Sequence, residues 1–221
     1  GRIHAEINQL RGDAGGTVSG RLSYAHPNLQ QIPARNKDLG PRIRSLFLPD
    51  KLCKWGSFDY SQQEPRLVAH YASSIGFNGS EELVEAYKNE NADFHQTVAD
   101  MAGIPRSQAK TINLGIFYGM GKNKLSRELG IDKDQAELIL KEYNAKVPFV
   151  KQLANRAADS ADKNGAIWTL KGRKCRFEQW EPSSFGLHKS TNFEDAVNKY
   201  GKNGIKRAGT YKALNRLIQG S

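Results

Sequence analysis

Four residues between positions 106 and 118 have types and a spacing that suit a nucleotide. They are Arg106, Lys110, Leu114 and Tyr118, each four residues after the last. In a helix such a row turns by only about 40° at each step, so it forms one stripe roughly 18 Å long. A nucleoside triphosphate has the same order, because the two cations suit its phosphates and the aromatic ring suits its base. Taken alone, the stripe fits a solvated helix with a tyrosine at its buried end rather better.

A second group of residues contains two carboxylates, Asp59 and Glu64. The segment 55–60 predicts a strand that ends in a polar site, and a helix follows, because apolar residues from Leu67 to Tyr71 recur at helical spacing. A carboxylate at the end of a buried strand is costly unless it is paired or holds a metal. Such a group suits the Mg²⁺ that nucleotidyl transfer places between a triphosphate and an attacking hydroxyl. A strand-end turn and a helix N-terminus are the alternative interpretations.

The elements that must position these residues are mostly helices. Ser61 is a candidate N-cap for the helix after Asp59, and Pro65 is acceptable only in the first turn of that helix. Asp132 is a candidate cap further along. The predicted helices are 81–89, 93–102, 106–118, 132–145 and 148–163, with a last one beginning near 208. The other predicted elements are short strands and turns in 1–50, a hairpin made by 167–170 and 174–177, and a long loop or excursion over 178–207.

Composition narrows the class of protein. Lys and Arg number 33 against 23 Asp and Glu, a formal net charge of +10, which favours a polyanionic partner such as nucleic acid. The two cysteines, Cys53 and Cys175, form no C-x-x-C pair and predict reduced thiols and no zinc site. No apolar run reaches the roughly 18 residues of a membrane span. We expect no membrane partner and a cytoplasmic location, that of the host cell if a phage encodes the protein.

The two groups of residues, taken together, resemble a known family. The segment DYSQQEPR at 59–66 resembles motif A of the family A DNA polymerases, and RSQAKTINLGIFYG at 106–119 resembles their motif B. Other segments that resemble the family are SGRLS at 19–23, PNLQQIP at 27–33, DFH at 93–95, TLKGR at 169–173, ALN at 213–215 and QG at 219–220. The joint order of these segments identifies the chain as a member of the family, most similar to phage replicative enzymes.

The resemblance implies template-directed DNA synthesis, with two Mg²⁺ ions, primer–template DNA and deoxynucleoside triphosphates as cofactors and partners. Asp59 would bind both metal ions, and the backbone carbonyl of Tyr60 would help. Arg106, Lys110 and His95 would contact the incoming triphosphate. Lys110 would also act as general acid toward the pyrophosphate leaving group. A processivity factor is not identified by the sequence.

The resemblance also implies contacts to the sugar, the base and the DNA. Glu64 with Tyr118 would close off the 2′ position of the sugar, because a carboxylate in that space excludes ribose. Tyr118 would lie under the templating or incoming base. Arg21, Asn215 and Gln219 would touch the minor groove or the template near the primer end, where shape matters more than sequence.

Some residues depart from the family's pattern. Many relatives carry Phe or Tyr at the place of Leu114, and an aromatic side chain there influences discrimination against sugars without a 3′ hydroxyl. Leucine has no hydroxyl, so we expect discrimination against dideoxynucleotides, as in relatives with Phe. Gln63 and Pro65 stand where bacterial relatives often have aliphatic residues. Arg35 is a further candidate for a phosphate contact, and His70 is expected to be structural.

The resemblance implies an α+β architecture with a palm, an antiparallel sheet with helices, and mostly helical fingers. The palm would comprise 1–80, which carries motif A, and the incomplete segment 208–221, whereas 81–207 would form the fingers with the motif B helix. Motif C, a His-Asp-Glu turn that carries the second metal-binding aspartate, does not occur before Ser221. We therefore expect the 221-residue chain to be inactive by itself, although the complete protein is a polymerase.

Two other classes of protein share part of this pattern. A single-subunit RNA polymerase shares the logic of the motifs, but it would not carry the Glu64 filter and usually has a different pair at Leu114 and Gly115. A basic nucleic-acid-binding protein without catalysis is the other alternative. The presence of the complete set of motif residues argues against it, because binding alone needs no metal carboxylate. The set is Asp59, Glu64, Arg106, Lys110 and Tyr118. A His-Asp-Glu turn after Ser221 would discriminate between enzyme and binding protein.

Overall fold

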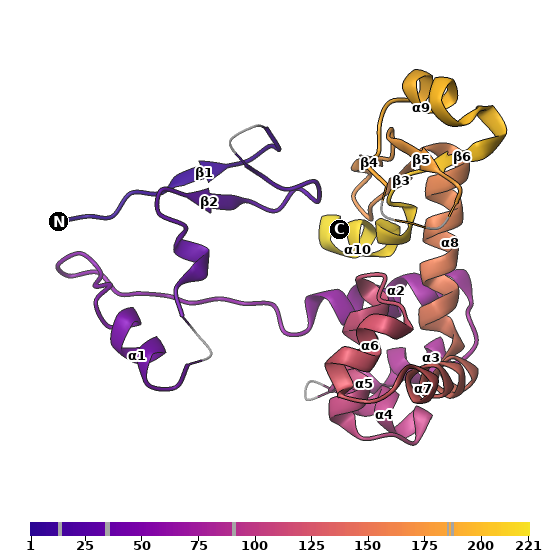
Figure 1. The fold of residues 1–221 in the computed structure, drawn as a ribbon. Helices are drawn as coiled ribbons and strands as arrows, with labels where there is room; N and C mark the ends of the chain where they lie inside the picture. Colours follow the sequence, from indigo (N-terminus) through magenta and orange to yellow (C-terminus); the bar gives the residue numbers. More distant parts are fainter. Residues whose placement is uncertain (13–14, 34–35, 90–91, 185, 187) are drawn as a thin grey trace. The chain divides into compact units, whose positions relative to one another are not determined.

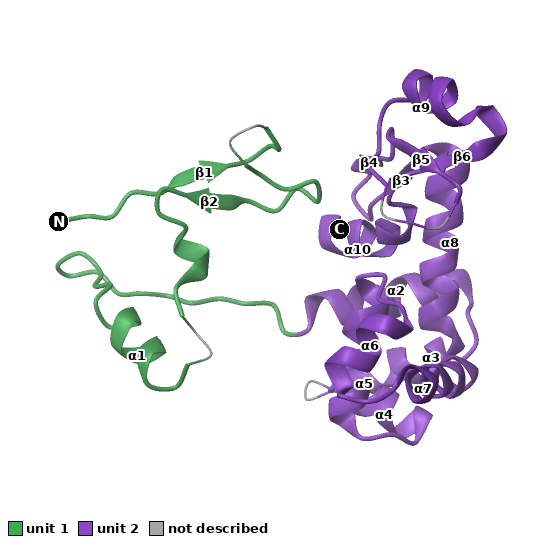
Figure 2. Ribbon diagram, viewed as in Figure 1, with its two compact units in different colours: residues 1–61 green, residues 62–221 purple. Residues whose placement is uncertain are grey.

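Residues 1–61 and residues 62–221 form two separate units, unit 1 and unit 2, in the computed structural model (Figures 1 and 2). The structure describes residues 1–12, 15–33, 36–89, 92–184, 186 and 188–221. Arg35, the further candidate for a phosphate contact, lies outside these ranges. Helices together with small antiparallel sheets confirm the α+β class that the sequence predicts.

Unit 1 is built from short elements that turns connect. Its elements are β1 (Glu6–Asn8), β2 (Ser23–Ala25), the 3₁₀ helix η1 (Leu29–Gln31) and α1 (Leu39–Arg44). The two strands are antiparallel, with Ile7 opposite Tyr24. The side chain of Asn28 caps η1 by accepting a hydrogen bond of 3.0 Å from the backbone N–H of Gln30. The predicted strands and turns are confirmed, whereas the sequence analysis did not predict α1.

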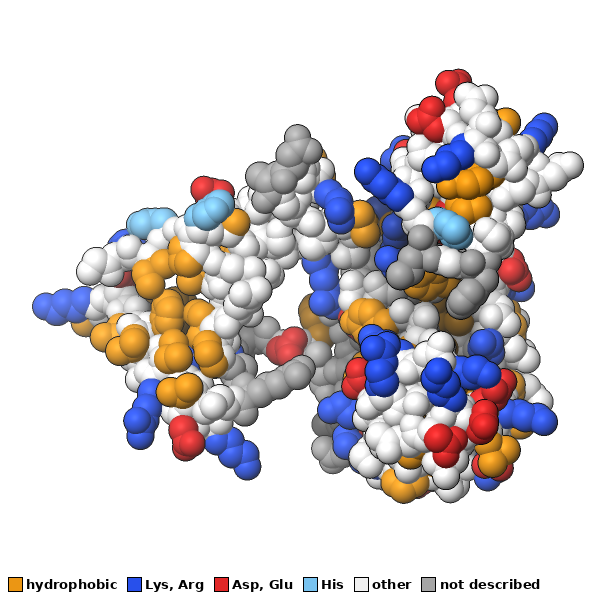
Figure 3. Space-filling view, viewed as in Figure 1, with side chains coloured by type: hydrophobic (Ala, Val, Ile, Leu, Met, Phe, Trp, Pro, Cys, Tyr) orange, Lys and Arg blue, Asp and Glu red, His pale blue; other side chains and the backbone are white. Residues whose placement is uncertain are grey.

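The strand predicted for 55–60 is wrong. The segment 53–60 has no regular secondary structure. A strand exists only where its N–H and C=O groups pair with a neighbour, and none of the strands in the described part of unit 1 pairs with this segment. Its side chains are accordingly exposed, Phe58 to 97% and Tyr60 to 81%. Figure 3 shows hydrophobic side chains gathered on the visible face of unit 1.

Unit 2 is mostly helical, as the sequence predicts. Its α-helices outside the segment 178–207 are α2 (Gln63–Ile75), α3 (Ser80–Ala86), α4 (Phe94–Ala102), α5 (Arg106–Phe117), α6 (Lys122–Leu129), α7 (Lys133–Lys146), α8 (Pro148–Asn164) and α10 (Ala213–Gly220). The predicted Asp132 cap is confirmed, because its side chain accepts bonds from two backbone N–H groups of α7. Pro148 opens α8, where its missing N–H costs nothing.

Two details of the helices differ from the sequence analysis. Ser61 is not the N-cap of α2, because that position belongs to Gln62, in a left-handed conformation with φ of 53°. Pro65 does lie in the first turn of α2, as required. Helix α6 was not predicted, because Leu125 is its one fully buried residue and leaves little apolar periodicity to detect.

The core of unit 2 forms around α8, which contacts α2, α5, α7 and α10. The largest fully buried side chains include Tyr143, Phe94, Phe117 and Phe149. Burial of each of the three phenylalanine side chains contributes roughly 1.5–3 kcal/mol relative to exposure. The core therefore fixes α4, α5 and α7 against one another. None of the described helices is both long enough and apolar enough to cross a membrane.

Beyond α8 the chain forms a hairpin and then a small folded excursion. The predicted hairpin is confirmed as β3 (Ala166–Trp168) and β4 (Lys174–Arg176), with Ile167 opposite Cys175. Of the loop or excursion predicted for 178–207, the structure shows an excursion, with elements that were not predicted: β5 (Trp180–Pro182), α9 (Phe193–Tyr200) and β6 (Ile205–Arg207). The ring of Trp180 packs edge-on against the ring of Phe193, with centroids 5.0 Å apart, and the Arg207 guanidinium lies 4.6 Å from the centroid of Trp180. The 3₁₀ turn η3 (Thr210–Lys212) then leads into α10.

Candidate functional site

Helix α5 displays the predicted stripe on its outer face. Arg106 and Lys110 are exposed, Leu114 is 36% exposed, and Tyr118 follows the last residue of the helix with 46% of its side chain exposed. The opposite face is apolar and buried, through Ala109, Ile112, Ile116 and Phe117. Because burial of this face fixes the rotation of α5, the order of cation, cation, leucine and tyrosine is presented to solvent.

Asp93 anchors the Arg106 end of the stripe. The Nε and Nη2 atoms of Arg106 donate to Asp93 Oδ2 at 2.9 and 2.6 Å. The other carboxylate oxygen caps α4, accepting from the backbone N–H groups of His95 at 2.9 Å and Gln96 at 3.2 Å. Partial burial alone would raise the pKa of Asp93, but these bonds outweigh it and hold the pKa below its ordinary value. Asp93 therefore stays ionised and ties the start of α5 to the start of α4.

His95 lies beside this anchor with its ring half-buried. The ring stands edge-on to Phe94, with centroids 5.5 Å apart at 82°, and its Nδ1 is 3.3 Å from Nδ2 of Asn113. Burial lowers the pKa of His95, the Asp93 carboxylate opposes that shift, and the charges of Arg106 and Lys110 lower the pKa further. The ring is therefore neutral at neutral pH. The structure brings three predicted triphosphate contacts, His95, Arg106 and Lys110, into one electrostatic cluster.

A glutamine joins the other end of the stripe to α2. The side-chain nitrogen of Gln219, in α10, donates to the Tyr118 hydroxyl at 3.0 Å and to Glu64 Oε1 at 3.3 Å. Glu64 and Tyr118, the predicted sugar filter, thus lie on either side of one amide group. Gln219 itself was predicted as a DNA contact. The structure shows it bonded within unit 2, a role that the sequence analysis missed.

The stripe borders a small pocket beside Leu114 and Tyr118. The pocket has a volume of about 220 Å³, and its wall includes Gly115, Met120 and Lys124. A Cβ atom on Gly115 would lie 1.8 Å from Cε and 3.2 Å from Cβ of Met120, so a larger residue here would require the methionine side chain to move. The close approach of these two residues shapes the wall next to Leu114.

Asp59 and Tyr60 belong to unit 1, whereas the stripe belongs to unit 2. Both side chains are exposed, on a segment without regular secondary structure. No group of three or more His, Cys, Asp or Glu side chains that could hold a metal ion occurs among the described residues. Asp59 is thus a single candidate ligand, which fits one part of a Mg²⁺ site and does not complete one.

The other predicted DNA contacts lie in both units. Arg21 is exposed in unit 1, and its backbone carbonyl accepts a bond of 2.6 Å from the Thr17 hydroxyl. Asn215 lies in α10, where its side-chain Nδ2 is buried and has no hydrogen-bond partner among the described residues. Figure 3 shows Lys and Arg side chains spread over the visible face of both units rather than gathered in one patch.

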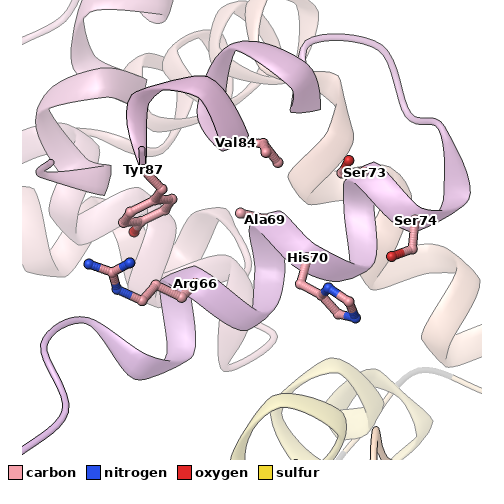
Figure 4. A pocket seen from close by; sticks show the side chains of 7 residues that line it. All are labelled: Arg66, Ala69, His70, Ser73, Ser74, Val84 and Tyr87. Carbon is pink, nitrogen blue, oxygen red and sulfur yellow. The ribbon is translucent and has the colours of Figure 1, made fainter. Parts of the chain in front are cut away.

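A groove of about 330 Å³ between α2 and α3 contains His70, the histidine expected to be structural (Figure 4). The Arg66 guanidinium lies 4.6 Å from the centroid of the Tyr87 ring at one end of this groove. His70 packs edge-on to Tyr71 with ring centroids 5.7 Å apart. The prediction for His70 remains a prediction, because these contacts are compatible with a structural role and with a binding role.

Comparison with known proteins identifies the family. The family model described as DNA polymerase family A matches residues 1–221, and the chain therefore belongs to DNA polymerase family A. It is 36% identical over 270 residues to "DNA-directed DNA polymerase" of Pseudomonas phage M6, which covers all of this chain and 37% of that protein. It is 38% identical over 205 residues to "DNA polymerase DpoZ" of Acinetobacter phage SH-Ab 15497, with 79% of this chain and 32% of that protein covered.

Bacterial relatives and a solved structure agree with this assignment. "DNA polymerase I, thermostable" of Thermus aquaticus is 36% identical over 183 residues, with 79% of this chain and 20% of that protein covered. The solved structure is described as "POL domain of Pol1 from M. smegmatis complex with DNA primer-template and dNTP". It matches with a TM-score of 0.71 and 29% identity over all of this chain and 35% of that one. The chain spans about a third of the length of the phage relatives.

Proposed function

We propose that the complete protein extends a DNA primer by template-directed addition of deoxynucleotides, and that this chain supplies much of its nucleotide pocket. The observation that carries the proposal is the outer face of α5. It begins at an Arg106 guanidinium held by Asp93 and ends at a Tyr118 hydroxyl held by Gln219. Family membership supports the assignment of this face to the incoming nucleotide.

The cationic end of the face would hold the triphosphate. Arg106 is oriented by two bonds to one carboxylate oxygen, so part of the entropy cost of ordering its side chain is met before a ligand arrives. Lys110 follows one turn later and would donate a proton to the pyrophosphate leaving group. His95 adds a neutral ring close to both cations. The three side chains offer donors of different geometry to adjacent phosphate oxygens.

The other end of the face would select the sugar and the base. Glu64 and Tyr118 would fill the space of a ribose 2′ hydroxyl, and the Gln219 amide that joins them would limit their motion. Tyr118 would support the base, and Leu114 would contact the sugar between base and phosphates. Because leucine has no hydroxyl to replace a missing 3′ hydroxyl, dideoxynucleotides would be poor substrates.

Asp59 and the backbone carbonyl of Tyr60 would provide ligands for Mg²⁺ in the complete protein. Two such ions, when bound, polarise the phosphoryl group and lower the pKa of the attacking hydroxyl. What this chain itself contributes there is one exposed carboxylate on a segment without regular structure. For that reason we also propose that the 221-residue chain does not synthesise DNA by itself.

The remaining partners follow from the same assignment. The net charge of +10 suits primer–template DNA, and Arg21, Asn215 and Gln219 would contact it near the primer end. Residues 1–80 and 208–221 would belong to the palm, and 81–207 to the fingers. A phage protein of this kind would act in the cytoplasm of the host cell.

Primer extension by the full-length protein tests the proposal. Lys110→Ala is expected to lower kcat at least a hundredfold, because general-acid catalysis and charge stabilisation are lost together. Lys133→Ala is the matched control, since Lys133 is also an exposed helical lysine but lies outside the stripe, and it should retain the activity of the unchanged protein. If Lys110→Ala retains that activity as well, α5 is not the nucleotide-binding element.

A further inference from the structure

A buried network of hydrogen bonds connects His95 to two other helices. The hydroxyl of Tyr143, in α7, donates to Oδ1 of Asn113, in α5, and Nδ2 of Asn113 lies 3.3 Å from Nδ1 of His95, in α4. Asn113 is completely buried and Tyr143 is 1% exposed. These polar groups lie in an otherwise apolar core, so each of them needs a hydrogen-bond partner.

The directions of these hydrogen bonds follow from the chemistry of the tyrosine. Burial raises the pKa of Tyr143, so its hydroxyl keeps its proton. Among the described residues, the hydrogen bond to Asn113 is the one that this hydroxyl makes. The tyrosine must therefore donate to the amide oxygen of Asn113, which leaves the amide nitrogen facing His95. An amide nitrogen donates and does not accept, so Nδ1 of His95 must be the acceptor.

The reversed amide is disfavoured. If the Asn113 side chain were turned over, its nitrogen would face Tyr143, and the buried tyrosine proton would have no acceptor among the described residues. An unsatisfied buried donor is costlier than a hydrogen bond is favourable. A doubly protonated His95 is disfavoured too, because its Nδ1–H would point at the amide hydrogens of Asn113. Arg106 and Lys110 oppose that protonation, and Asp93 favours it.

We propose that Asn113 and Tyr143 are positioning residues that hold His95 as the neutral tautomer with its proton on Nε2. The ring then presents a donor, rather than a lone pair, on the side away from Asn113. A donor attracts a phosphate oxygen, whereas a lone pair repels it, and the neutral ring adds no third full charge beside Arg106 and Lys110. The ligand in this inference rests on the proposed function, but the tautomer does not.

The tautomer can be measured in the 221-residue chain labelled with ¹⁵N-histidine. Two-bond ¹H–¹⁵N correlation spectra distinguish a protonated Nε2 from a protonated Nδ1, and His95→Gln identifies the His95 signals among the five histidines. We expect Nε2 of His95 to be protonated and Nδ1 to have the shift of an acceptor. A His95 with its proton on Nδ1, or an even mixture of tautomers, overturns the proposal.

Two variants test whether the buried hydrogen-bond network sets the tautomer of His95. Asn113→Asp places an acceptor in front of Nδ1 and should move the proton of His95 to that nitrogen, with a higher pKa for the ring. Tyr143→Phe lets the amide turn over and should give mixed tautomers. Tyr71→Phe is the matched control, because it removes a hydroxyl that hydrogen-bonds to Ser221 Oγ at 2.8 Å and lies outside the buried network. An unchanged His95 in folded Tyr143→Phe overturns the proposal, even if Asn113→Asp does not fold.

Addition of dATP separates this inference from the proposed function. We expect dATP to shift the Nε2 signal of His95 in the unchanged chain and in Tyr71→Phe. In the full-length protein, Tyr143→Phe should raise the KM for dATP about threefold to tenfold, with a smaller change in kcat. A protonated Nε2 that dATP does not shift supports the tautomer and contradicts the phosphate contact. A protonated Nδ1 whose signal dATP shifts contradicts the proposed tautomer and supports the phosphate contact.

Discussion

The contact between Asp93 and Arg106 can be separated from the helix cap that the same carboxylate makes. Asp93→Asn keeps an oxygen for the cap, since asparagine caps helices as well as aspartate, and removes the charge that holds Arg106. Asp93→Ala removes both. The two side chains are 34% and 47% exposed, so solvent screens the pair and its contribution falls within about 0.2–1 kcal/mol. Because two donors share one oxygen, we take the upper half of that range for Asp93→Asn.

In Asp93→Ala the loss of the helix cap lowers the free energy of unfolding further. Replacing a capping side chain by alanine costs typically about 1 kcal/mol. We therefore expect Asp93→Asn to lower the free energy of unfolding by about 0.5–1 kcal/mol and Asp93→Ala by about 1.5–2 kcal/mol. Urea unfolding of the 221-residue chain, followed by circular dichroism, resolves that difference. A double-mutant cycle that combines Asp93→Asn with Arg106→Gln should give the interaction free energy of the Asp93–Arg106 pair alone.

The sign of the pH dependence follows from the pKa of Asp93. Because the pKa lies below its ordinary value of 3.8 in the folded chain, the carboxylate contributes stability above that value. The contribution is lost as the pH falls through the folded pKa. The unchanged chain should therefore exceed Asp93→Asn in stability at pH 7 and approach it in acid. Equal destabilisation by Asp93→Asn and Asp93→Ala at pH 7, or a difference that does not shrink in acid, would refute the reasoning.

Three further predictions concern the pocket and the isolated chain. Gly115→Ala should displace the Met120 side chain, because its Cβ would lie 1.8 Å from Met120 Cε and 3.2 Å from Met120 Cβ. The overpacking cost of about 1–3 kcal/mol is offset by about 1 kcal/mol of helix propensity, so we expect a net loss of about 0–2 kcal/mol in thermal unfolding, and a clear gain in stability would contradict the clash. The full-length protein, with Leu114 in its pocket, should prefer deoxynucleotides to dideoxynucleotides strongly in competition assays, and near-equal use would contradict the prediction. The 221-residue chain should extend no primer with Mg²⁺, and clear Mg²⁺-dependent synthesis would contradict this prediction.

Helices with local signals were predictable from the sequence. Asp132 and Pro148 mark helix starts by chemistry that involves only neighbouring residues, and the structure confirms both. The prediction of a strand at 55–60 was wrong, because a strand depends on a partner strand, which the local sequence does not reveal. The helix and strands within the excursion over 178–207 were not predicted, because their order rests on distant contacts, such as Arg207 against Trp180.

The candidate site shows the same division. Motif residues such as Arg106 and Tyr118 could be proposed from the family resemblance, but their partners could not. Asp93 carried one usable signal, an aspartate directly before a helix. Asn113 carried another, as a polar residue on the apolar face of α5, and Tyr143 carried none. Which helices lie side by side is a property of packing, so the bonds between α4, α5 and α7 had to come from the structure.

The bridge that Gln219 makes has a consequence for how duplex DNA would be sensed. An amide nitrogen carries two hydrogens, and both are engaged here, one by Tyr118 and one by Glu64. The minor groove presents acceptors at every base pair, and a donor only at guanine. If Gln219 is to reach a groove acceptor, it must give up one of its two bonds. Binding of duplex DNA would then be thermodynamically linked to the release of Tyr118 or Glu64, the residues proposed to exclude ribose, from Gln219. Each process would favour the other by the same factor.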